Sequence, residues 1–175
     1  MRRGVLFPVL LLLVAAGALA LRLPRLGDRP MHGDEAVHAA RFQQLWEEHA
    51  YAYDPNEFHG PTLYYATLPI VWVQGAHRLG ETTESTFRLV PVLFGAGLIG
   101  LLWLLADALG RRAVLLAGVL TALSPAMLFY SRYYIQEMLL VFFTFGAIAA
   151  GWRYAWSRRL GWALLAGACL GLMHA

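Results

Sequence analysis

The sequence has little charge, a single cysteine and no lysine. Of its 175 residues only 14% are charged and 59% are hydrophobic, and the mean hydropathy is +0.53. This composition excludes an ordinary soluble domain and indicates a membrane protein. Cys169 alone can form neither an intrachain disulfide nor a thiolate cluster for zinc. Because all 14 basic residues are arginines, widely scattered, and the net charge is only +3, nucleic-acid binding is also excluded.

Five uncharged stretches have about the length needed to cross a hydrocarbon core of roughly 30 Å. They cover residues 4–21, 89–106, 113–131, 138–152 and 160–175. The first, with Ala18-Leu19-Ala20 near its end, is also typical of a cleaved signal peptide, but the later stretches favour an uncleaved anchor. We therefore expect an all-α polytopic membrane protein with about five transmembrane helices. The last stretch reaches the final residue uncapped, which predicts the N-terminal part of a longer membrane domain.

A sixth stretch, residues 60–76, is uncharged but is interrupted by Pro61, Pro69 and Gln74. If it does not span, seven arginines flank the short loops on the cytoplasmic side; if it spans, only five do. The charge distribution therefore predicts an interfacial or re-entrant segment on the outer side. We accordingly expect a cytoplasmic N-terminus in the inner (plasma) membrane.

This topology predicts a long external loop over residues 22–88. The loop holds nine of the eleven acids and five of the six histidines, so any chemistry is expected on the outer face. The joint between the third and fourth spans, Tyr130 to Glu137, emerges on the same face. We therefore expect Arg132 and Glu137 to meet the loop.

Near its start the loop carries Gly33-Asp34-Glu35-Ala36, after which apolar residues recur at helical spacing. The pattern predicts an amphipathic helix at the membrane surface. Asp34 stands at its N-terminus, where a carboxylate is favoured, and a plain N-cap is one interpretation. The other is an ionised carboxylate at the membrane rim that accepts a proton from a hydroxyl. Adjacent helical side chains point about 100° apart, so Asp34 and Glu35 are not expected to share a proton.

A divalent metal such as Mg, Mn or Zn is a further hypothesis. Asp34 and His38 are one helical turn apart, and His59, or His32, can join them if the fold allows. The spacing matches no established metal motif, and loop histidines also form ordinary hydrogen bonds. Glu57 and His59 are similarly open to two interpretations, a solvated turn or part of a site.

Arg132 lies at the end of a span, where a charge is costly unless it is paired, solvated or used. Its planar guanidinium suits bidentate binding of a phosphate, which a lipid-linked substrate presents near this depth. Snorkelling to headgroups, or an internal pair with Glu137, is the alternative interpretation.

Taken together, these motifs resemble the start of membrane glycosyltransferases of the GT-C fold. The relatives are protein O-mannosyltransferases and aminoarabinose transferases (GT39- and GT83-like), and the nearest resemblance is to a bacterial and archaeal branch named for association with flippase activity. The elements that carry the resemblance are Gly33-Asp34-Glu35-Ala36, His59-Gly60-Pro61-Thr62-Leu63-Tyr64-Tyr65, Arg88-Leu89-Val90-Pro91 and the joint from Ser124-Pro125 through Tyr130-Ser131-Arg132 to Glu137.

The resemblance implies catalytic roles for Asp34, as base or metal-site residue, and for its neighbour Glu35. The donor would be a sugar on polyprenyl phosphate, with Arg132 holding the phosphate. Glu137 matches an acid found after the third span in relatives, and His59 and Tyr64 are further candidates for substrate contact. The His59-Gly60-Pro61 turn departs from the Lys-Pro-Pro of aminoarabinose transferases, which leaves its role open.

Two functional classes follow from these inferences. The first is an enzyme that transfers a sugar from a lipid carrier on the extracytoplasmic face. The second is a non-catalytic partner of lipid-linked sugar translocation, using the same groove only for binding. The sequence names neither the sugar nor the acceptor.

Overall fold

The computed structural model describes residues 3–52 and 60–174, which contain helices and no strands. The main helices are α1 (Arg3–Arg22), α2 (Gly33–Glu47), α3 (Thr62–Gln74), α4 (Glu84–Leu101), α6 (Arg111–Leu123), α8 (Glu137–Ser157) and α9 (Leu160–His174). Short elements connect them: η1 (Leu79–Glu81), η2 (Leu102–Leu105), α5 (Ala106–Leu109) and α7 (Pro125–Tyr130). The expected all-α membrane protein is confirmed.

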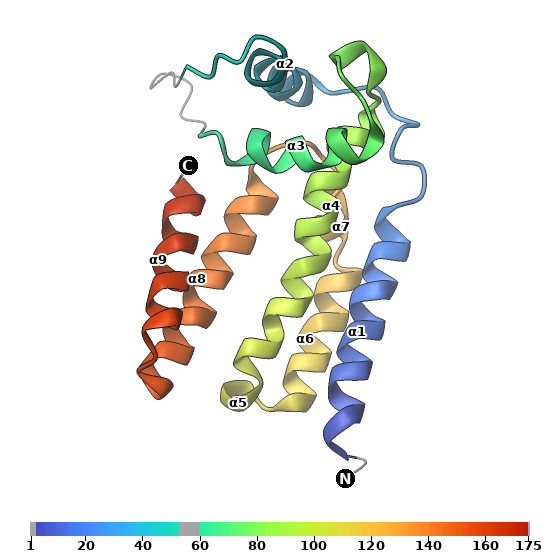
Figure 1. The fold of residues 1–175 in the computed structure, drawn as a ribbon. Coiled ribbons are helices and arrows are strands. Elements are labelled where there is room, and N and C mark those ends of the chain that lie inside the picture. The colour runs from blue at the N-terminus through green and yellow to red at the C-terminus, as the bar shows by residue number, and fades with distance from the viewer. Residues whose placement is uncertain (1–2, 53–59, 175) are drawn as a thin grey trace.

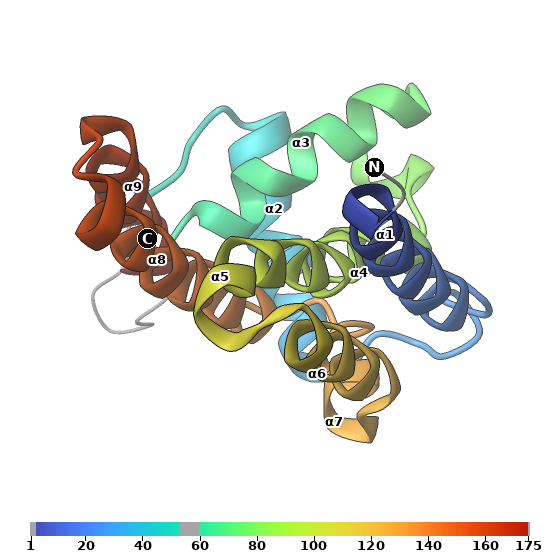
Figure 2. The same ribbon diagram turned by 90° about the horizontal axis from the view of Figure 1, so that it is seen from below.

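The long apolar helices form a bundle, and two helices of the external loop lie across one of its ends (Figure 1). Helix α1 packs on α4 and α6, whereas α8 packs on α4 and α9. Viewed along the bundle, α4 lies between these two groups (Figure 2). The segment predicted to be interfacial forms α3, which runs crosswise to the bundle, and it ends at Gly75 in the left-handed conformation (φ 68°).

The helix bounds differ from the five expected spans. Three segments of the described chain are long and apolar enough to cross a membrane: Val5–Arg22, Glu84–Leu109 and Glu137–Ser157. Helix α9 is apolar but shorter. The stretch expected to form one span over 113–131 is divided at Ser124, whose ψ of 124° is not helical. Pro125 explains the break, because proline disfavours helical geometry in the preceding residue and begins a new helix readily.

The apolar face of α2 is covered by protein. Ala39 and Phe42 are buried in a cluster with Leu63 of α3, Phe87 of α4 and Tyr134. This face of α2 packs on protein because α3 lies between α2 and the bundle (Figure 1). The position of α2 at the membrane surface stays a prediction. The packing fixes the N-terminal end of α2, and with it Asp34 and Glu35, above the bundle.

Candidate active site

The first turn of α2 is built by His32 and Glu35. His32 is the N-cap residue, and its ring nitrogen Nδ1 accepts from the backbone N–H of Asp34 at 3.4 Å. Glu35 accepts in return from the backbone N–H of His32 at 3.1 Å. The interpretation of Asp34 as the N-cap is therefore wrong, because His32 occupies that position and leaves the Asp34 carboxylate 70% exposed.

Glu35, in contrast, is fully buried and held by Arg88 of α4. The guanidinium donates from Nε to Oε1 and from Nη2 to Oε2, both at 2.7 Å. Oε1 also accepts from the backbone N–H of Tyr134 at 3.0 Å. The same arginine donates through Nη1 to the carbonyls of Leu26 and Arg29. One buried ion pair thus joins the start of α2, the preceding loop, α4 and the joint before α8.

These contacts determine the charge state of Glu35. Burial raises the pKa of its carboxyl, but the hydrogen bonds from Arg88, Tyr134 and His32 and the charge of Arg88 outweigh burial, so the pKa lies below its ordinary value. A carboxylate with this many donors stays ionised and is a poor proton acceptor. The geometry therefore assigns Glu35 to holding the site together and leaves Asp34 as the exposed carboxylate.

Asp34 faces a cavity of about 400 Å³ at the end of the bundle. Its opposite side is formed by the start of α8, including Gln136 and Glu137, and by the end of α9, including His174. Gln136 donates to the carbonyl of Gly60 at 2.7 Å, which ties the joint before α8 to the approach to α3. The structure thus brings Asp34 and Glu137 to one cavity.

A second cavity, of about 250 Å³, lies on the other side of the α2 N-terminus and is rich in arginine. It is lined by Arg25, Leu26, Arg29, Arg88, Leu128, Phe129 and Arg132. Arg132 donates to the carbonyls of Pro24 at 2.6 Å and Arg25 at 3.2 Å, so it meets the external loop as the topology predicts. It pairs neither with Glu137 nor with another carboxylate of the described chain. Arg29 and Arg88 both pair with Glu35, and Arg25 lies 3.9 Å from Asp28. Among the described residues Arg132 is therefore the lining arginine without a carboxylate partner, and its guanidinium favours an anion.

Tyr133 contacts one residue of each cavity, Asp34 and Arg29. Its hydroxyl donates to Asp34 Oδ2 at 3.4 Å, and the Arg29 guanidinium lies over its ring at 5.2 Å from the centroid. Phe129 stacks on the same ring. Burial, and then the nearby negative charges of Asp34 and Glu35, raise the pKa of Tyr133, so it stays a neutral donor. No motif in the sequence marks Tyr133, Arg29 or Gln136 as a site residue, although Tyr133 and Gln136 lie in the joint that the topology places on this face.

Two further predicted site residues, Tyr64 and His38, lie in the described part of the chain. Tyr64 is only 2% exposed, and its hydroxyl shares a hydrogen bond with His38 Nδ1 at 3.0 Å. His38 lines the Asp34 cavity. His59 and Glu57 lie outside the described residues. Within the described ranges, no three His, Cys, Asp or Glu side chains are grouped as metal ligands, so Asp34 and His38 do not by themselves form a metal centre.

The fold and the site define a helical membrane protein with an exposed carboxylate and an arginine-lined cavity at one end of its bundle. The family model for dolichyl-phosphate-mannose-protein mannosyltransferase matches residues 39–174. The chain therefore belongs to this family, which supports a membrane glycosyltransferase in general terms. The matched range begins just after Asp34 and Glu35. No curated protein and no solved structure matches the chain.

Proposed function

We propose that the chain carries the donor-side part of a glycosyltransferase that moves a sugar from a polyprenyl-phosphate donor to an acceptor hydroxyl, with Asp34 as the base. The observation that carries this proposal is the contrast between the two neighbouring acids. Glu35 is buried and saturated by donors, whereas Asp34 is exposed at a cavity large enough for a sugar. The charge distribution of the loops favours the extracytoplasmic face of the inner membrane for this cavity.

The arginine-lined cavity supplies what the donor phosphate needs. Arg25, Arg29 and Arg132 come from the loop after α1 and from the joint before α8, so both segments converge on one anion. Tyr133 contacts Arg29 through its ring and Asp34 through its hydroxyl. A phosphate bound by the arginines is therefore separated from the Asp34 carboxylate by the side chain of Tyr133. This arrangement suits a sugar that reaches from the phosphate into the Asp34 cavity.

The reaction follows from these positions. The Asp34 carboxylate accepts the proton of the acceptor hydroxyl while the hydroxyl oxygen forms a bond to the anomeric carbon of the sugar. The bond between that carbon and the phosphate oxygen breaks, and its electron pair leaves with the polyprenyl phosphate. The guanidinium groups stabilise the negative charge that develops on the phosphate. Attack opposite the leaving group inverts the anomeric carbon.

A divalent cation at Asp34 and His38 stays a prediction of the sequence, with His59 as its third ligand. The described residues alone do not complete such a site, and no step of the proposed reaction passes through a metal.

The test uses the full-length protein in lipid, supplied with radiolabelled polyprenyl-phosphate sugars and a membrane acceptor fraction. Wild type is compared with Asp34→Asn and with Asp28→Asn, a control in the same loop whose carboxylate is also 70% exposed. We expect transfer by wild type and by Asp28→Asn, and its loss in Asp34→Asn. If wild type moved the labelled lipid across the bilayer without transferring its sugar, the translocation-partner alternative would replace this proposal.

A further inference from the structure

A third cavity, of about 700 Å³, lies at the other end of α2 and is unrelated to the Asp34 site. It is lined by Leu45, Trp46, Glu47, His49, Leu68, Trp72, Gly75, Ala76, His77 and Arg78. Glu47 lies thirteen positions after Asp34 in α2, which corresponds to about 20 Å along the helix. The proposed transfer reaction therefore does not account for this cavity.

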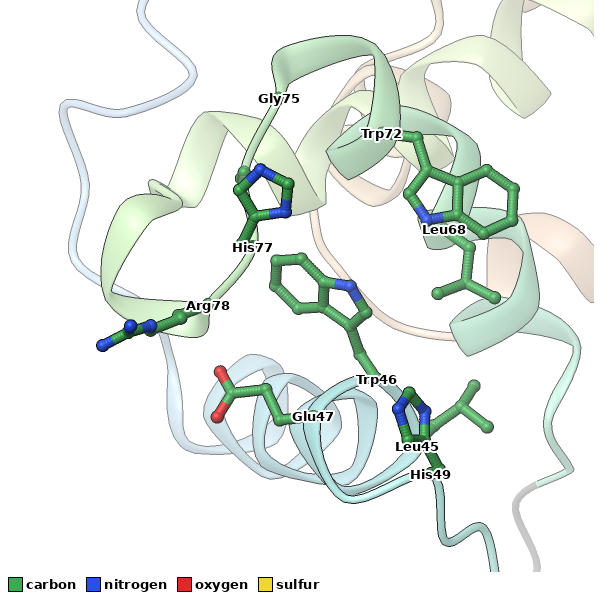
Figure 3. A pocket seen from close by; sticks show the side chains of 10 residues that line it. Leu45, Trp46, Glu47, His49, Leu68, Trp72, Gly75, His77 and Arg78 are labelled. Atoms are coloured by element: carbon green, nitrogen blue, oxygen red, sulfur yellow. The ribbon is translucent and has the colours of Figure 1, made fainter.

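Two indole rings lie in the apolar part of the cavity, beside Leu45, Leu68 and Ala76. Trp46 comes from the last turn of α2, and Trp72 from the last turn of α3 (Figure 3). Trp72 is 64% exposed, whereas Trp46 packs on Phe42 with 5.3 Å between ring centroids. One ring is therefore fixed by the core, and the other is open to an incoming molecule.

Acidic and basic side chains both lie around these rings. Figure 3 shows His77 across from the Trp46 ring, and Glu47 and Arg78 to one side of it. Glu47 Oε1 accepts from the backbone N–H of Leu79 at 2.6 Å and Oε2 from Gln43 at 3.0 Å, so its carboxylate is fixed. The hydrogen bond from Gln43, that from Leu79 and the charge of Arg78 lower its pKa. The cavity thus offers an oriented acceptor beside cationic and imidazole donors.

This combination of indole rings with charged and imidazole side chains favours some classes of ligand over others. An acyl chain would displace water from the guanidinium of Arg78 and the imidazoles of His49 and His77 without replacing its hydrogen bonds, which costs free energy. A phosphate would be repelled by the carboxylate of Glu47, which stands in the same lining as Arg78. A pyranose ring presents C–H groups with partial positive charge on its face, which complement the negative face of an indole. Its hydroxyls both donate and accept at the ring edge.

We propose that this cleft between α2 and the end of α3 is a binding site for a neutral saccharide, separate from the reaction centre at Asp34. Trp46 and Trp72 receive the face of the sugar ring. Glu47 accepts from its hydroxyls, Arg78 donates to them from the same side of the Trp46 ring, and His77 binds them from across that ring. The site holds a sugar about 20 Å from Asp34, so binding there does not depend on the transfer reaction.

The test is saturation-transfer NMR on the full-length protein in a detergent without a sugar headgroup, with methyl α-mannoside, maltose and cellobiose as probes. We expect binding of at least one probe with a Kd on the order of millimolar. Trp72→Ala and Arg78→Gln should each weaken it by at least about fivefold. Trp156→Ala is the matched control, because Trp156 is 73% exposed but lies at the end of α8 away from α2 and α3. Asp34→Asn should bind the probes as wild type does.

Three results would overturn the proposal: no binding of any of the probes by wild type, equal weakening by Trp72→Ala and Trp156→Ala, or loss of binding in Asp34→Asn. Competition by inorganic phosphate or by phosphatidylglycerol vesicles that displaced the saccharide would also count against it, in favour of an anionic ligand. Thermal unfolding of each variant identifies a failure to fold, and Trp46→Leu, which keeps apolar packing on Phe42 but removes the ring, gives a second variant.

Discussion

Glu35 and Arg88, 53 positions apart in the chain, form a buried bidentate ion pair with two hydrogen bonds of 2.7 Å. The pair fixes α2 against α4, with Asp34 in the first turn of α2 at the 400 Å³ cavity and Arg88 at the arginine-lined one. Its neighbour Asp34 remains exposed. The different environments of the two adjacent acids follow from this one contact. The Glu35 side chain packs inward and binds Arg88, whereas the Asp34 side chain points away from it.

Removing one partner of this pair is expected to destabilise the protein strongly. Glu35→Gln leaves the buried guanidinium of Arg88 without its carboxylate, which typically costs about 3–5 kcal/mol. Arg88→Gln should cost less, because Arg29 still lies 3.5 Å from Glu35. Asp107→Asn is the control, because Asp107 and Arg153 also pair at 2.7 Å but are partly exposed, so its expected effect is below about 1 kcal/mol. Thermal unfolding of the full-length protein measures both. Equal effects of the two changes would show that the buried pair has no special weight.

The stability of the protein should depend on pH through Glu35. The pKa of this carboxyl in the folded state lies below its ordinary value of 4.5, so its contribution is present above that value. The contribution is lost as the pH falls through the folded pKa. We expect the difference in Tm between wild type and Glu35→Gln to be large at neutral pH and to shrink below about pH 4.5. A difference independent of pH down to acid unfolding would contradict the assignment of an ionised Glu35.

Helix α4 approaches the joint after α7 closely at Gly95. A Cβ at this position would stand 2.6 Å from the Cβ of Ser131, whereas a Cβ at Gly100 in the same helix would meet nothing within 4 Å. Gly95→Ala should therefore destabilise by about 1–3 kcal/mol. Gly100→Ala should be neutral or stabilise by up to about 1 kcal/mol, because alanine favours the helix. If thermal unfolding ranked the two variants the other way, the packing of Ser131 on α4 would be wrong.

The arginine-lined cavity predicts that Arg29 contributes to the binding of polyprenyl phosphate. Arg29→Gln removes a guanidinium from the cavity, from the face of Tyr133 and from its pair with Glu35. The affinity for polyprenyl phosphate should fall by about tenfold, the effect of losing one charge-assisted contact. Arg112→Gln, at the N-terminus of α6, is the control and should leave affinity unchanged. Binding of fluorescent polyprenyl phosphate measures both. An unchanged affinity in Arg29→Gln would show that this cavity does not bind the phosphate.

Much of the fold was predictable because it depends on local pattern. Uncharged stretches indicated the helices of the bundle, and the prolines in residues 60–76 indicated a segment outside it. The topology also placed Arg132 and Glu137 on the face of the external loop, where the structure has them. The partner of Glu35 could not be predicted from the pattern. Two residues that pair across 53 positions produce no periodicity in the sequence.

Two other differences have local causes. The break at Ser124 separates α6 from α7 because Pro125 follows it, although the stretch is uncharged throughout and satisfies a length criterion for a span. The exposure of Asp34 depends on His32 taking the N-cap position, and histidine is an uncommon capping residue. Local propensity therefore favoured the aspartate, whereas the packing of Glu35 on Arg88 determined which residue begins the helix.

The most direct test of the account is the separation of donor binding from transfer in Asp34→Asn. The exposed carboxylate makes few contacts, so the variant should unfold at the temperature of wild type and bind the polyprenyl-phosphate sugar with unchanged Kd. Its kcat for sugar transfer should fall by about 10²–10⁴-fold, the range for removal of a general base. Transfer by Asp34→Asn at the wild-type rate would contradict the role of Asp34 as the base.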